Sequence, residues 1–242
     1  MITNVKIFPD SQAMATAAAE LFLGLGERSI RQRGCYLVAL SGGSTPEALY
    51  QSLADPANQS RLDWTVVHFF WGDERHVPPD HPDSNYRAAK EALLDCIPIP
   101  LGNVHRVHAE MSPQAGASDY EEALRDFFAD DWPRFDLILL GMGGDGHTAS
   151  LFPHSEGLGE ENRWFIANFA PKMGQWRLTL TKNAINAART ILVMVSGESK
   201  AEMLAQVLIG PKDPLERPIQ LISPIHGEML WMVDEAAAAH LS

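Results

Sequence analysis

Residues 36–54 read YLVALSGGSTPEALYQSLA, and this stretch predicts a strand, a glycine-rich loop and a helix in that order. The first five residues, 36–40, are apolar and lead to a pair of glycines, which is typical of a buried strand in a parallel sheet. Pro46 suits the first turn of a helix, because its missing N–H breaks no hydrogen bond there. The stretch therefore predicts one strand–loop–helix unit of an α/β fold.

The same alternation continues along the chain. Further buried strands are expected at residues 66–71, 137–140, 191–195 and 229–233, with a strand-like run at 164–169. Helices are expected at residues 11–33, 46–54, 85–94, 113–129, 183–188, 198–208 and 234–241. Because strands alternate with helices, we predict an α/β fold in which residues 1–242 form a single doubly wound domain, with a mostly parallel sheet flanked by helices.

Composition excludes several classes of function. The chain has 242 residues, 19 Lys and Arg against 31 Asp and Glu, and a net charge of −12, which argues against a nucleic-acid partner. No run of about 18 apolar residues is present to span a membrane, and the N-terminal segment lacks the pattern of a signal peptide, so a cytoplasmic protein is expected. Cys35 and Cys96 lack CxxC spacing and are expected to be buried, reduced thiols.

The loop after the first quoted strand consists of small polar residues and glycine, namely Ser41, Gly42, Gly43, Ser44 and Thr45. Backbone N–H groups of such a loop, together with the N-terminus of the following helix, favour an anion. No Gly-Lys-Ser/Thr follows, so the loop is not a P-loop. The sequence predicts a phosphate or sugar site here; the alternative is a tight turn with a serine cap.

A second polar segment, Asp73, Glu74 and Arg75, follows the strand expected at 66–71. The carboxyl ends of parallel strands are where open α/β sheets bind ligands. Arg75 can hold an oxyanion in two hydrogen bonds, or it can pair with a neighbouring carboxylate at the surface. The histidines in the proline-rich stretch 72–84 lack the helical register of a metal site, so no metal is expected.

A third segment follows the strand expected at 137–140 and contains a formal GxGxxG within residues 141–146. Dinucleotide binding is disfavoured, because Pro153 interrupts the expected helix and the next strand-like run does not end in an acid. Asp145 and His147 lie two residues apart on this glycine turn. They suit an acid–base pair in which the carboxylate orients the imidazole; the alternative is a structural histidine bonded to its own loop.

Two cations elsewhere in the chain are candidates for the same site. Lys200 begins the helix expected at 198–208 directly after a strand, so its side chain can lean over the edge of the sheet toward the glycine turn. Arg177 lies in the sequence QWRLTLT, residues 175–181. A single Lys or Arg is by default a solvated surface residue, so position alone favours neither.

Five ordered blocks of the chain together resemble the 6-phosphogluconolactonases, a branch of the wider group that includes glucosamine-6-phosphate deaminases and ribose-5-phosphate isomerases. The blocks are LSGGSTPEALYQSLA (40–54), WGDERHVPPDHPDSNYRAAKEALL (71–94), DLILLGMGGDGHTASLFPHS (136–155), WRLTLTKNAINAARTILVMVSGESKAEML (176–204) and LWMVDEAAA (230–238). The resemblance implies a doubly wound α/β domain that hydrolyses 6-phospho-D-glucono-1,5-lactone in the oxidative pentose phosphate pathway. It implies a small-molecule sugar-phosphate lactone as partner, without a metal or other cofactor, and we expect a monomer or weak homo-oligomer.

The resemblance also assigns roles to the candidate residues. His147, positioned by Asp145, is expected to be the general base for a water molecule, and Arg75 to stabilise charge that develops on oxygen. The residues expected to bind substrate are Ser41, Gly42, Gly43, Ser44, Thr45, Asp73, Arg177 and Lys200.

Two departures separate the branches of this group. Deaminases follow the histidine with a segment of the type Ala-Phe-Asn-Glu-Pro, whereas residues 149–153 here read ASLFP and contain no carboxylate. Deaminases usually carry a tyrosine where this chain has Arg75. Both differences favour the lactonase. The alternatives are an amino-sugar-phosphate deaminase or isomerase with Asp73 as base, and a sugar-phosphate sensor in which His147 is idle.

Overall fold

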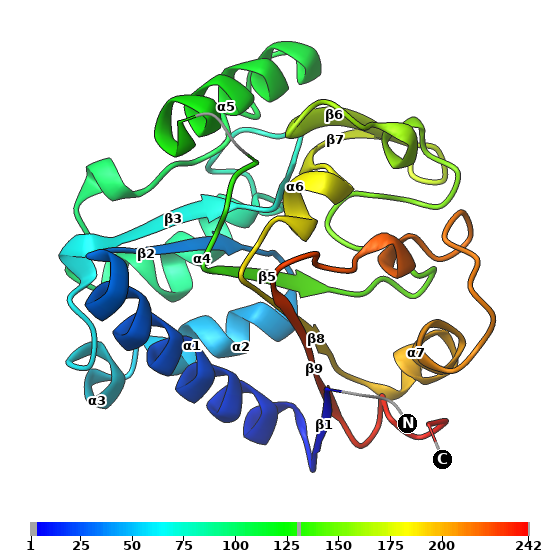
Figure 1. The fold of residues 1–242 in the computed structure, drawn as a ribbon, viewed down its shortest axis with the longest axis horizontal. Coiled ribbons are helices and arrows are strands. Elements are labelled where there is room, and N and C mark those ends of the chain that lie inside the picture. Colours follow the sequence, from blue (N-terminus) through cyan, green and yellow to red (C-terminus); the bar gives the residue numbers. More distant parts are fainter. Residues whose placement is uncertain (1–3, 130–131, 242) are drawn as a thin grey trace.

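The computed structural model describes residues 4–129 and 132–241, and its centre is a six-stranded parallel sheet flanked by helices (Figure 1). The strand order is β1-β9-β8-β5-β2-β3. The bounds of these strands are β1 (Val5–Phe8), β2 (Tyr36–Leu40), β3 (Val67–Trp71), β5 (Leu137–Gly141), β8 (Thr190–Val195) and β9 (Glu228–Asp234). All five pairings between neighbours in this order are parallel, which confirms the predicted α/β fold class.

The helices confirm most of the predicted segments. The α-helices are α1 (Ser11–Arg33), α2 (Ser44–Leu53), α3 (Pro56–Gln59), α4 (Asn85–Ala92), α5 (Pro113–Phe128), α6 (Lys182–Asn186) and α7 (Ala201–Leu208). The short 3₁₀ helices are η1 (Trp64–Val66), η2 (Leu94–Cys96), η3 (Leu101–Asn103), η4 (Glu156–Gly159), η5 (Glu198–Lys200) and η6 (Pro218–Leu221). Helix α1 has the predicted bounds, because Asp10 caps its first turn and Gly34 ends it in the left-handed conformation.

The core lies between the central strands and the helices. Strands β5 and β8 are buried along nearly their whole length, as expected for parallel strands covered on both faces. Phe22 of α1 packs with Tyr36, Trp64 and Phe69, with ring centroids 5.2–6.4 Å apart. This packing fixes the strands firmly, so the segments that leave their carboxyl ends begin from a rigid edge.

A second, antiparallel sheet lies beyond β3 and was not predicted. Its order is β4-β7-β6, formed by β4 (Asp73–Arg75), β7 (Gln175–Leu180) and β6 (Phe165–Ala170). Helix α5 packs against β6 and β7, and Figure 1 shows it above this hairpin. Strand β4 lies within the proline-rich stretch 72–84, where no strand was predicted; its three residues are too few to give a periodic signal.

Two further expectations are wrong, and one strand was missed. Of residues 234–241, which were expected to form a helix, Asp234 ends β9 and residues 235–240 form turns; a helix of so few residues is marginal by itself. Strand β1 was missed, since it is a four-residue edge strand. Both cysteines are free thiols, but Cys35 is only half-buried and Cys96 is exposed.

No helix among the described residues has the length and apolar character needed to cross a membrane.

Candidate active site

The predicted functional segments meet at one edge of the large sheet. Strands β3, β2, β5 and β8 are neighbours in that order and all run in the same direction, so the loops after them leave the same edge. The amide of Gly72 donates to the carbonyl of Leu40 at 2.9 Å and thereby ties two of these loops together. The arrangement is the one in which open α/β sheets bind ligands.

The glycine turn after β5 positions Asp145 and His147 as a hydrogen-bonded pair. His147 Nδ1 lies 2.5 Å from Asp145 Oδ1, and the side chains are 30% and 31% exposed. Since an ionised carboxylate only accepts hydrogen bonds, Nδ1 carries a proton, and in the neutral imidazole Nε2 then keeps its lone pair. Nε2 makes no hydrogen bond with any residue that the structure describes. The bond to His147 also lowers the pKa of Asp145 to about 2.

Glycines are required around this pair. A Cβ atom on Gly143 would lie 2.1 Å from His147 Nδ1 and 2.8 Å from Asp145 Oδ1, so no side chain fits there. Gly146 has φ +80° and is packed against Arg217. The glycines of the GxGxxG pattern thus serve the conformation of the turn that carries Asp145 and His147.

The imidazole faces a cavity of about 220 Å³ with largely apolar walls. Its ring centroid lies 4.6 Å from that of Phe152. The lining residues are Gly144, Asp145, His147, Phe152, Pro153, Ala170, Pro171, Lys172 and Met173. Apolar walls limit the water around the imidazole, which strengthens its electrostatic interactions with a ligand.

The small polar loop after β2 divides into two parts. Ser41 is buried. Its N–H donates to the Tyr50 hydroxyl at 3.1 Å, and that hydroxyl donates to the Ser41 carbonyl at 2.6 Å, so the backbone groups of Ser41 already have partners. Helix α2 then begins at Ser44, after the exposed Gly43 with φ +105°. The N–H groups of Ser44 and Thr45 lie in the first helical turn, where they have no acceptor within the helix. This part of the loop suits an anion.

The two acidic residues after β3 have different surroundings. Glu74 is 2% exposed, and its carboxylate accepts from the amides of Arg75, Asn85 and Tyr86 at 2.7–2.8 Å. Burial raises its pKa, although these three bonds oppose the shift. Glu74 therefore holds the start of α4 and is a structural residue. Asp73 instead accepts a hydrogen bond from the Ser150 hydroxyl at 2.6 Å.

Arg75 and Arg177 lie opposite each other in the β4–β7 pair. Both line a cavity of about 710 Å³ with His76, His81 and Trp176 among its other walls. Arg75 donates to the carbonyl of Asp83 at 2.8 Å, and among the described residues it forms no ion pair with a carboxylate. Burial, and then the charge of Arg75, lower the pKa of Arg177. Two guanidinium groups in one cavity suit an anion.

Lys200 lies on η5 after β8, as predicted. Its Nζ would be 3.9 Å from a Cβ atom on Gly144, so it reaches the turn that carries His147. No ion pair of this ammonium is found within residues 4–129 and 132–241. The cavity beside His147 and the cavity of the two arginines border the same connection between β6 and β7. The structure thus brings the candidate cations to both sides of that connection.

Sequence reasoning missed Ser150 and Asn85, which both bond to Asp73. Ser150 was noted only for the absence of a carboxylate in its segment, and Asn85 only as the start of a helix. No local signal identifies them, because each contact joins segments that are distant in the chain.

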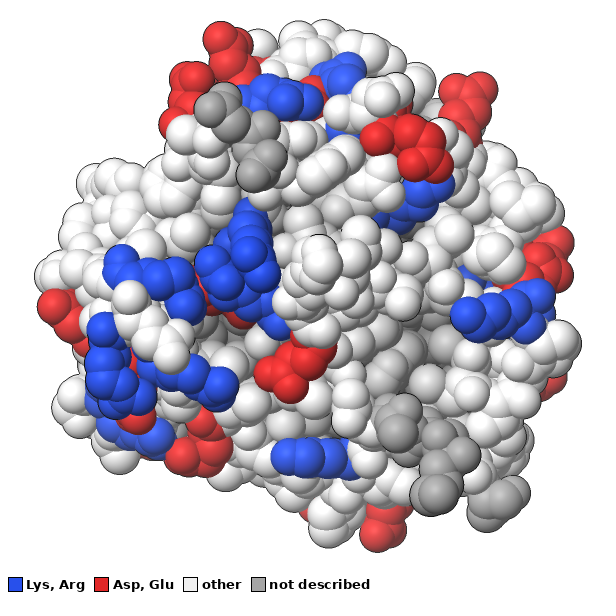
Figure 2. All heavy atoms as spheres, in the orientation of Figure 1, with Lys and Arg blue, Asp and Glu red and all other residues white. Residues whose placement is uncertain are grey.

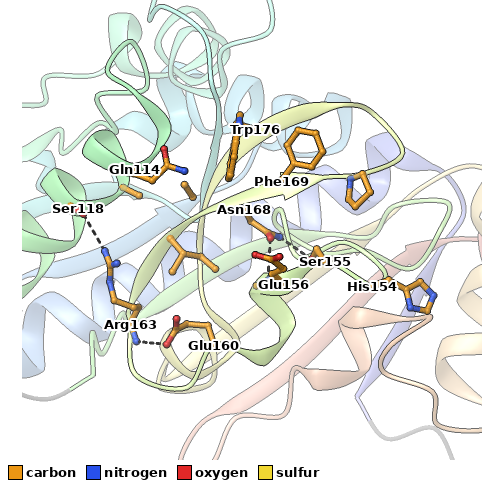
Figure 3. Close-up of a pocket in the computed structure, with 15 residues that line it drawn as sticks. Gln114, Ser118, His154, Ser155, Glu156, Glu160, Arg163, Asn168, Phe169 and Trp176 are labelled. Carbon is orange, nitrogen blue, oxygen red and sulfur yellow. Dashed lines mark hydrogen bonds between the residues drawn. The ribbon is translucent and has the colours of Figure 1, made fainter.

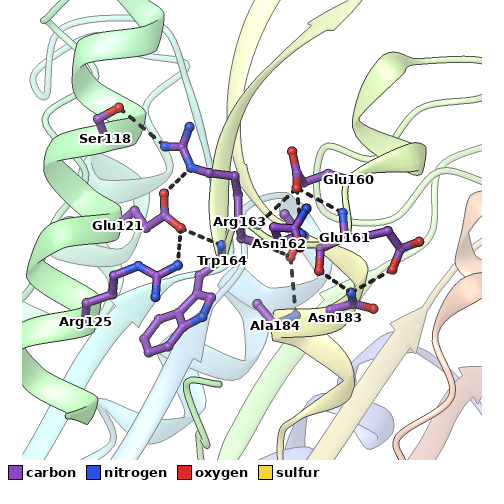
Figure 4. A network of polar contacts seen from close by, with 11 residues as sticks. Ser118, Glu121, Arg125, Glu160, Glu161, Asn162, Arg163, Trp164, Asn183 and Ala184 are labelled. Carbon is purple, nitrogen blue, oxygen red and sulfur yellow. Dashed lines mark hydrogen bonds and ion pairs between the residues drawn. The ribbon is translucent and has the colours of Figure 1, made fainter. Parts of the chain in front are cut away.

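Another cavity, of about 690 Å³, is lined by residues of α5, η4 and the β6–β7 hairpin (Figure 3). Asn168 at its base is satisfied, since it donates to the Ser150 carbonyl and the Ser155 hydroxyl and accepts from Gly157. Beside it, Glu121 joins Arg163, Arg125 and the Trp164 amide (Figure 4). These groups pair with one another, so they anchor the hairpin.

Figure 2 shows Lys and Arg side chains gathered over the C-terminal end of α1 and the start of β5. There Arg33 and Arg189 lie 2.7 and 3.2 Å from the buried carboxylate of Asp136, which directly precedes β5. This cluster is at the amino ends of the strands, on the edge opposite the candidate site. Its arginines stabilise a buried charge.

Comparisons with known proteins agree with this geometry. The family model described as glucosamine-6-phosphate isomerases/6-phosphogluconolactonase matches residues 9–231. The 6-phosphogluconolactonase of Nostoc sp. is 42% identical, with 100% of both chains covered, and that of Synechocystis sp. is 44% identical, with 100% of this chain and 99% of the relative covered. The structure of 6-phosphogluconolactonase from Trypanosoma cruzi superposes with a TM-score of 0.87 at 29% identity, covering 99% of this chain and 97% of the other. From the family model and these full-length matches, the chain belongs to the glucosamine-6-phosphate isomerase/6-phosphogluconolactonase family.

Proposed function

We propose that this protein is a 6-phosphogluconolactonase, which hydrolyses 6-phospho-D-glucono-1,5-lactone to 6-phospho-D-gluconate with His147 as general base. The relatives that carry this name are 42% and 44% identical over the whole chain. The observation that carries the proposed chemistry is the His147 imidazole, held at Nδ1 by Asp145 and free at Nε2, facing a cavity.

In the proposed reaction, Nε2 of His147 removes a proton from water as its oxygen adds to the lactone carbonyl. The developing imidazolium is stabilised by the adjacent Asp145 carboxylate, and Arg75 stabilises the negative charge on the carbonyl oxygen. Collapse of the tetrahedral intermediate breaks the bond to the ring oxygen, which takes the proton back from His147. The product is the open-chain acid. Neither a metal nor another cofactor is used.

The phosphate group is proposed to bind away from the reacting carbon. Its candidate partners are the amides of Gly42, Gly43 and Ser44 with the Thr45 hydroxyl, and the cations Arg177 and Lys200. A remote anchor contributes to the rate because it fixes the carbonyl against the base. Ser41 serves this loop through the two bonds to Tyr50. We further propose that residues 1–242 act as one domain, as a monomer or weak homo-oligomer.

Lys200→Ala tests this anchor. Loss of one charge-assisted hydrogen bond to phosphate is expected to raise KM about 10-fold to 100-fold, with a smaller change in kcat. Lys212→Ala is the matched control, because Lys212 is exposed and lines neither the cavity beside His147 nor that of the two arginines. An unchanged KM in Lys200→Ala removes this residue from the phosphate site.

The second candidate function is deamination or isomerisation of an amino-sugar phosphate, with Asp73 as the base. Asp73 does lie at the carboxyl edge of the strands, which supports this alternative. Against it, one carboxylate oxygen is already bonded to Ser150, and residues 149–153 offer no second carboxylate.

The first experiment compares substrates. 6-Phosphogluconolactone is generated in situ from glucose 6-phosphate, and the wild-type rate is corrected for spontaneous opening. We expect rapid hydrolysis of the lactone and no release of ammonia from glucosamine 6-phosphate. Ammonia release without lactone hydrolysis would establish the deaminase. Binding of 6-phosphogluconate with neither reaction would indicate a sensor.

A further inference from the structure

The carboxylate of Asp73 lies at the carboxyl edge of the strands, in the segment that directly follows β3, and is only 7% exposed. Among the described residues it forms no ion pair, and its one side-chain partner is the Ser150 hydroxyl, 2.6 Å from Oδ2. A buried charge is costly unless hydrogen bonds compensate for the lost water. Oδ1 makes no hydrogen bond with the described residues, so it remains available as an acceptor.

Ser150 itself is held rigidly. It is 1% exposed, its amide donates to the Thr179 hydroxyl at 3.2 Å, and its carbonyl accepts from Asn168 at 2.8 Å. The preceding residue, Ala149, has φ +46°, a left-handed conformation that residues with a Cβ atom rarely adopt. Such strain persists where surrounding contacts enforce it, and it is concentrated at functional sites. Here it turns the chain after His147 so that Ser150 reaches Asp73.

Asn85 holds Asp73 from the other side. Its Nδ2 donates to the Asp73 carbonyl at 2.9 Å, and the side chain lies so close to Gly42 that a Cβ atom there would be 1.8 Å from Oδ1. Asn85 is 2% exposed, and its Oδ1 is buried without a partner among the described residues. An unpaired buried acceptor destabilises a protein, and an apolar side chain of similar shape would remove that penalty. The hydrogen bond to Asp73 therefore explains why residue 85 carries a side-chain amide rather than an apolar group.

We propose that Ser150 and Asn85 are positioning residues that fix Asp73 so that its Oδ1 accepts a hydrogen bond from a hydroxyl group of the sugar phosphate. Ser150 occupies Oδ2 and sets the rotation of the carboxylate, while Asn85 fixes the backbone at the same residue. A fixed, desolvated acceptor discriminates strongly between sugars that present a hydroxyl to it and sugars that do not. This inference rests on the proposed function only for the identity of the ligand.

The test measures binding rather than turnover, with two probes: 6-phosphogluconate, which has sugar hydroxyls, and inorganic phosphate, which has none. In Ser150→Ala the dissociation constant of 6-phosphogluconate should rise about 10-fold to 100-fold. Without Ser150 the Asp73 carboxylate is no longer fixed, and its hydrogen bond with the sugar hydroxyl is lost. That of phosphate should stay within about 2-fold, because only the hydroxyl contact is removed. Asn85→Leu should show the same pattern, and Ser150→Thr should restore wild-type binding.

Ser155→Ala is the matched control. Its hydroxyl is also buried, but it bonds to Phe152 and Asn168 and not to Asp73. It should bind both probes as the wild type does, and melting curves should show that every variant is folded.

Several results would overturn the inference: unchanged binding of 6-phosphogluconate in Ser150→Ala, an equal loss for phosphate, or a folded Ser150→Thr protein that binds as poorly as Ser150→Ala. A wild type that binds 6-phosphogluconate without hydrolysing the lactone contradicts the proposed function but leaves this inference standing. A wild type that does not bind 6-phosphogluconate overturns both.

Discussion

Two pairs of ionisable residues follow buried strands of the same sheet, and their surroundings differ. Asp145 and His147, after β5, are about one-third exposed and face a cavity. Asp73 and Glu74, after β3, are 7% and 2% exposed. The first pair keeps one nitrogen free for chemistry, whereas Glu74 uses both carboxylate oxygens to hold the start of α4.

The difference shows what a polar residue at a strand end means. Its position predicts that it lies at the carboxyl edge of the parallel strands, and the structure confirms this position for both pairs. Its role depends on which neighbouring backbone N–H groups lack an acceptor. The backbone amides at the start of α4 donate to both oxygens of the Glu74 carboxylate. The glycine turn, by contrast, provides a partner for only one nitrogen of the His147 imidazole.

The largest expected effect is on the exposed pair. His147→Ala should reduce kcat for the lactone by about 100-fold to 10,000-fold, because a positioned base is lost. Its melting temperature should stay near that of the wild type, since the side chain is 30% exposed. Steady-state kinetics and a melting curve on the same sample check both. His154→Ala, another exposed histidine at the surface, is the control and should keep its kcat.

Substitution in the buried pair, Asp73 and Glu74, should change the stability of the fold. Glu74→Ala leaves the amides of Arg75, Asn85 and Tyr86 without an acceptor and should lower the free energy of unfolding by about 3 kcal/mol. Urea denaturation measures this loss. Glu122→Ala, on the exposed face of α5, should change it by less than about 0.5 kcal/mol. Equal stability of Glu74→Ala and Glu122→Ala would contradict the structural role.

Asp145→Asn tests the orientation of the imidazole. The amide can donate to Nδ1, which moves the proton of the neutral ring to Nε2 and removes the lone pair that accepts from water. We expect kcat to fall about 100-fold, with little change in KM. A kcat within 3-fold of the wild-type value would mean that Asp145 does not set the tautomer.

The smallest effect is the acid dependence of stability. The pKa of Asp145 is about 2 in the folded protein, below its ordinary value of 3.8. A carboxylate with a depressed pKa stabilises the fold above its unfolded pKa, and that contribution is lost as pH falls from about 4 to about 2. Free energies of unfolding over this range should therefore fall more steeply for wild type than for Asp145→Asn. Parallel curves would contradict the depressed pKa.

Much of the large sheet was predictable, because its strands are short apolar runs that end at glycine or polar residues. The helix α1 was predicted to the residue, because Asp10 and Gly34 are strong local signals. By contrast, the alanine-rich residues 234–241 favoured a helix locally, whereas Asp234 ends β9, where its carboxylate accepts from Ser196 and Gly197 in the loop after β8. Local propensity cannot report such a tertiary contact.

The candidate site divides in the same way. The Asp145–His147 pair was predictable, since both residues lie on one turn. The structural role of Glu74 was not predictable, because its carboxylate accepts hydrogen bonds from amides about ten residues further along the chain. Nor was the contact between Asp73 and Ser150, which are 77 residues apart.

The central claim, that His147 acts as the base, is tested most directly by adding imidazole to His147→Ala. The truncated side chain leaves room for imidazole next to the cavity, beside Asp145. We predict that lactone hydrolysis by this variant rises with imidazole and saturates, above the rate of imidazole alone in buffer. Hydrolysis that does not respond to imidazole beyond that background, or a variant as fast as the wild type without it, would contradict the claim.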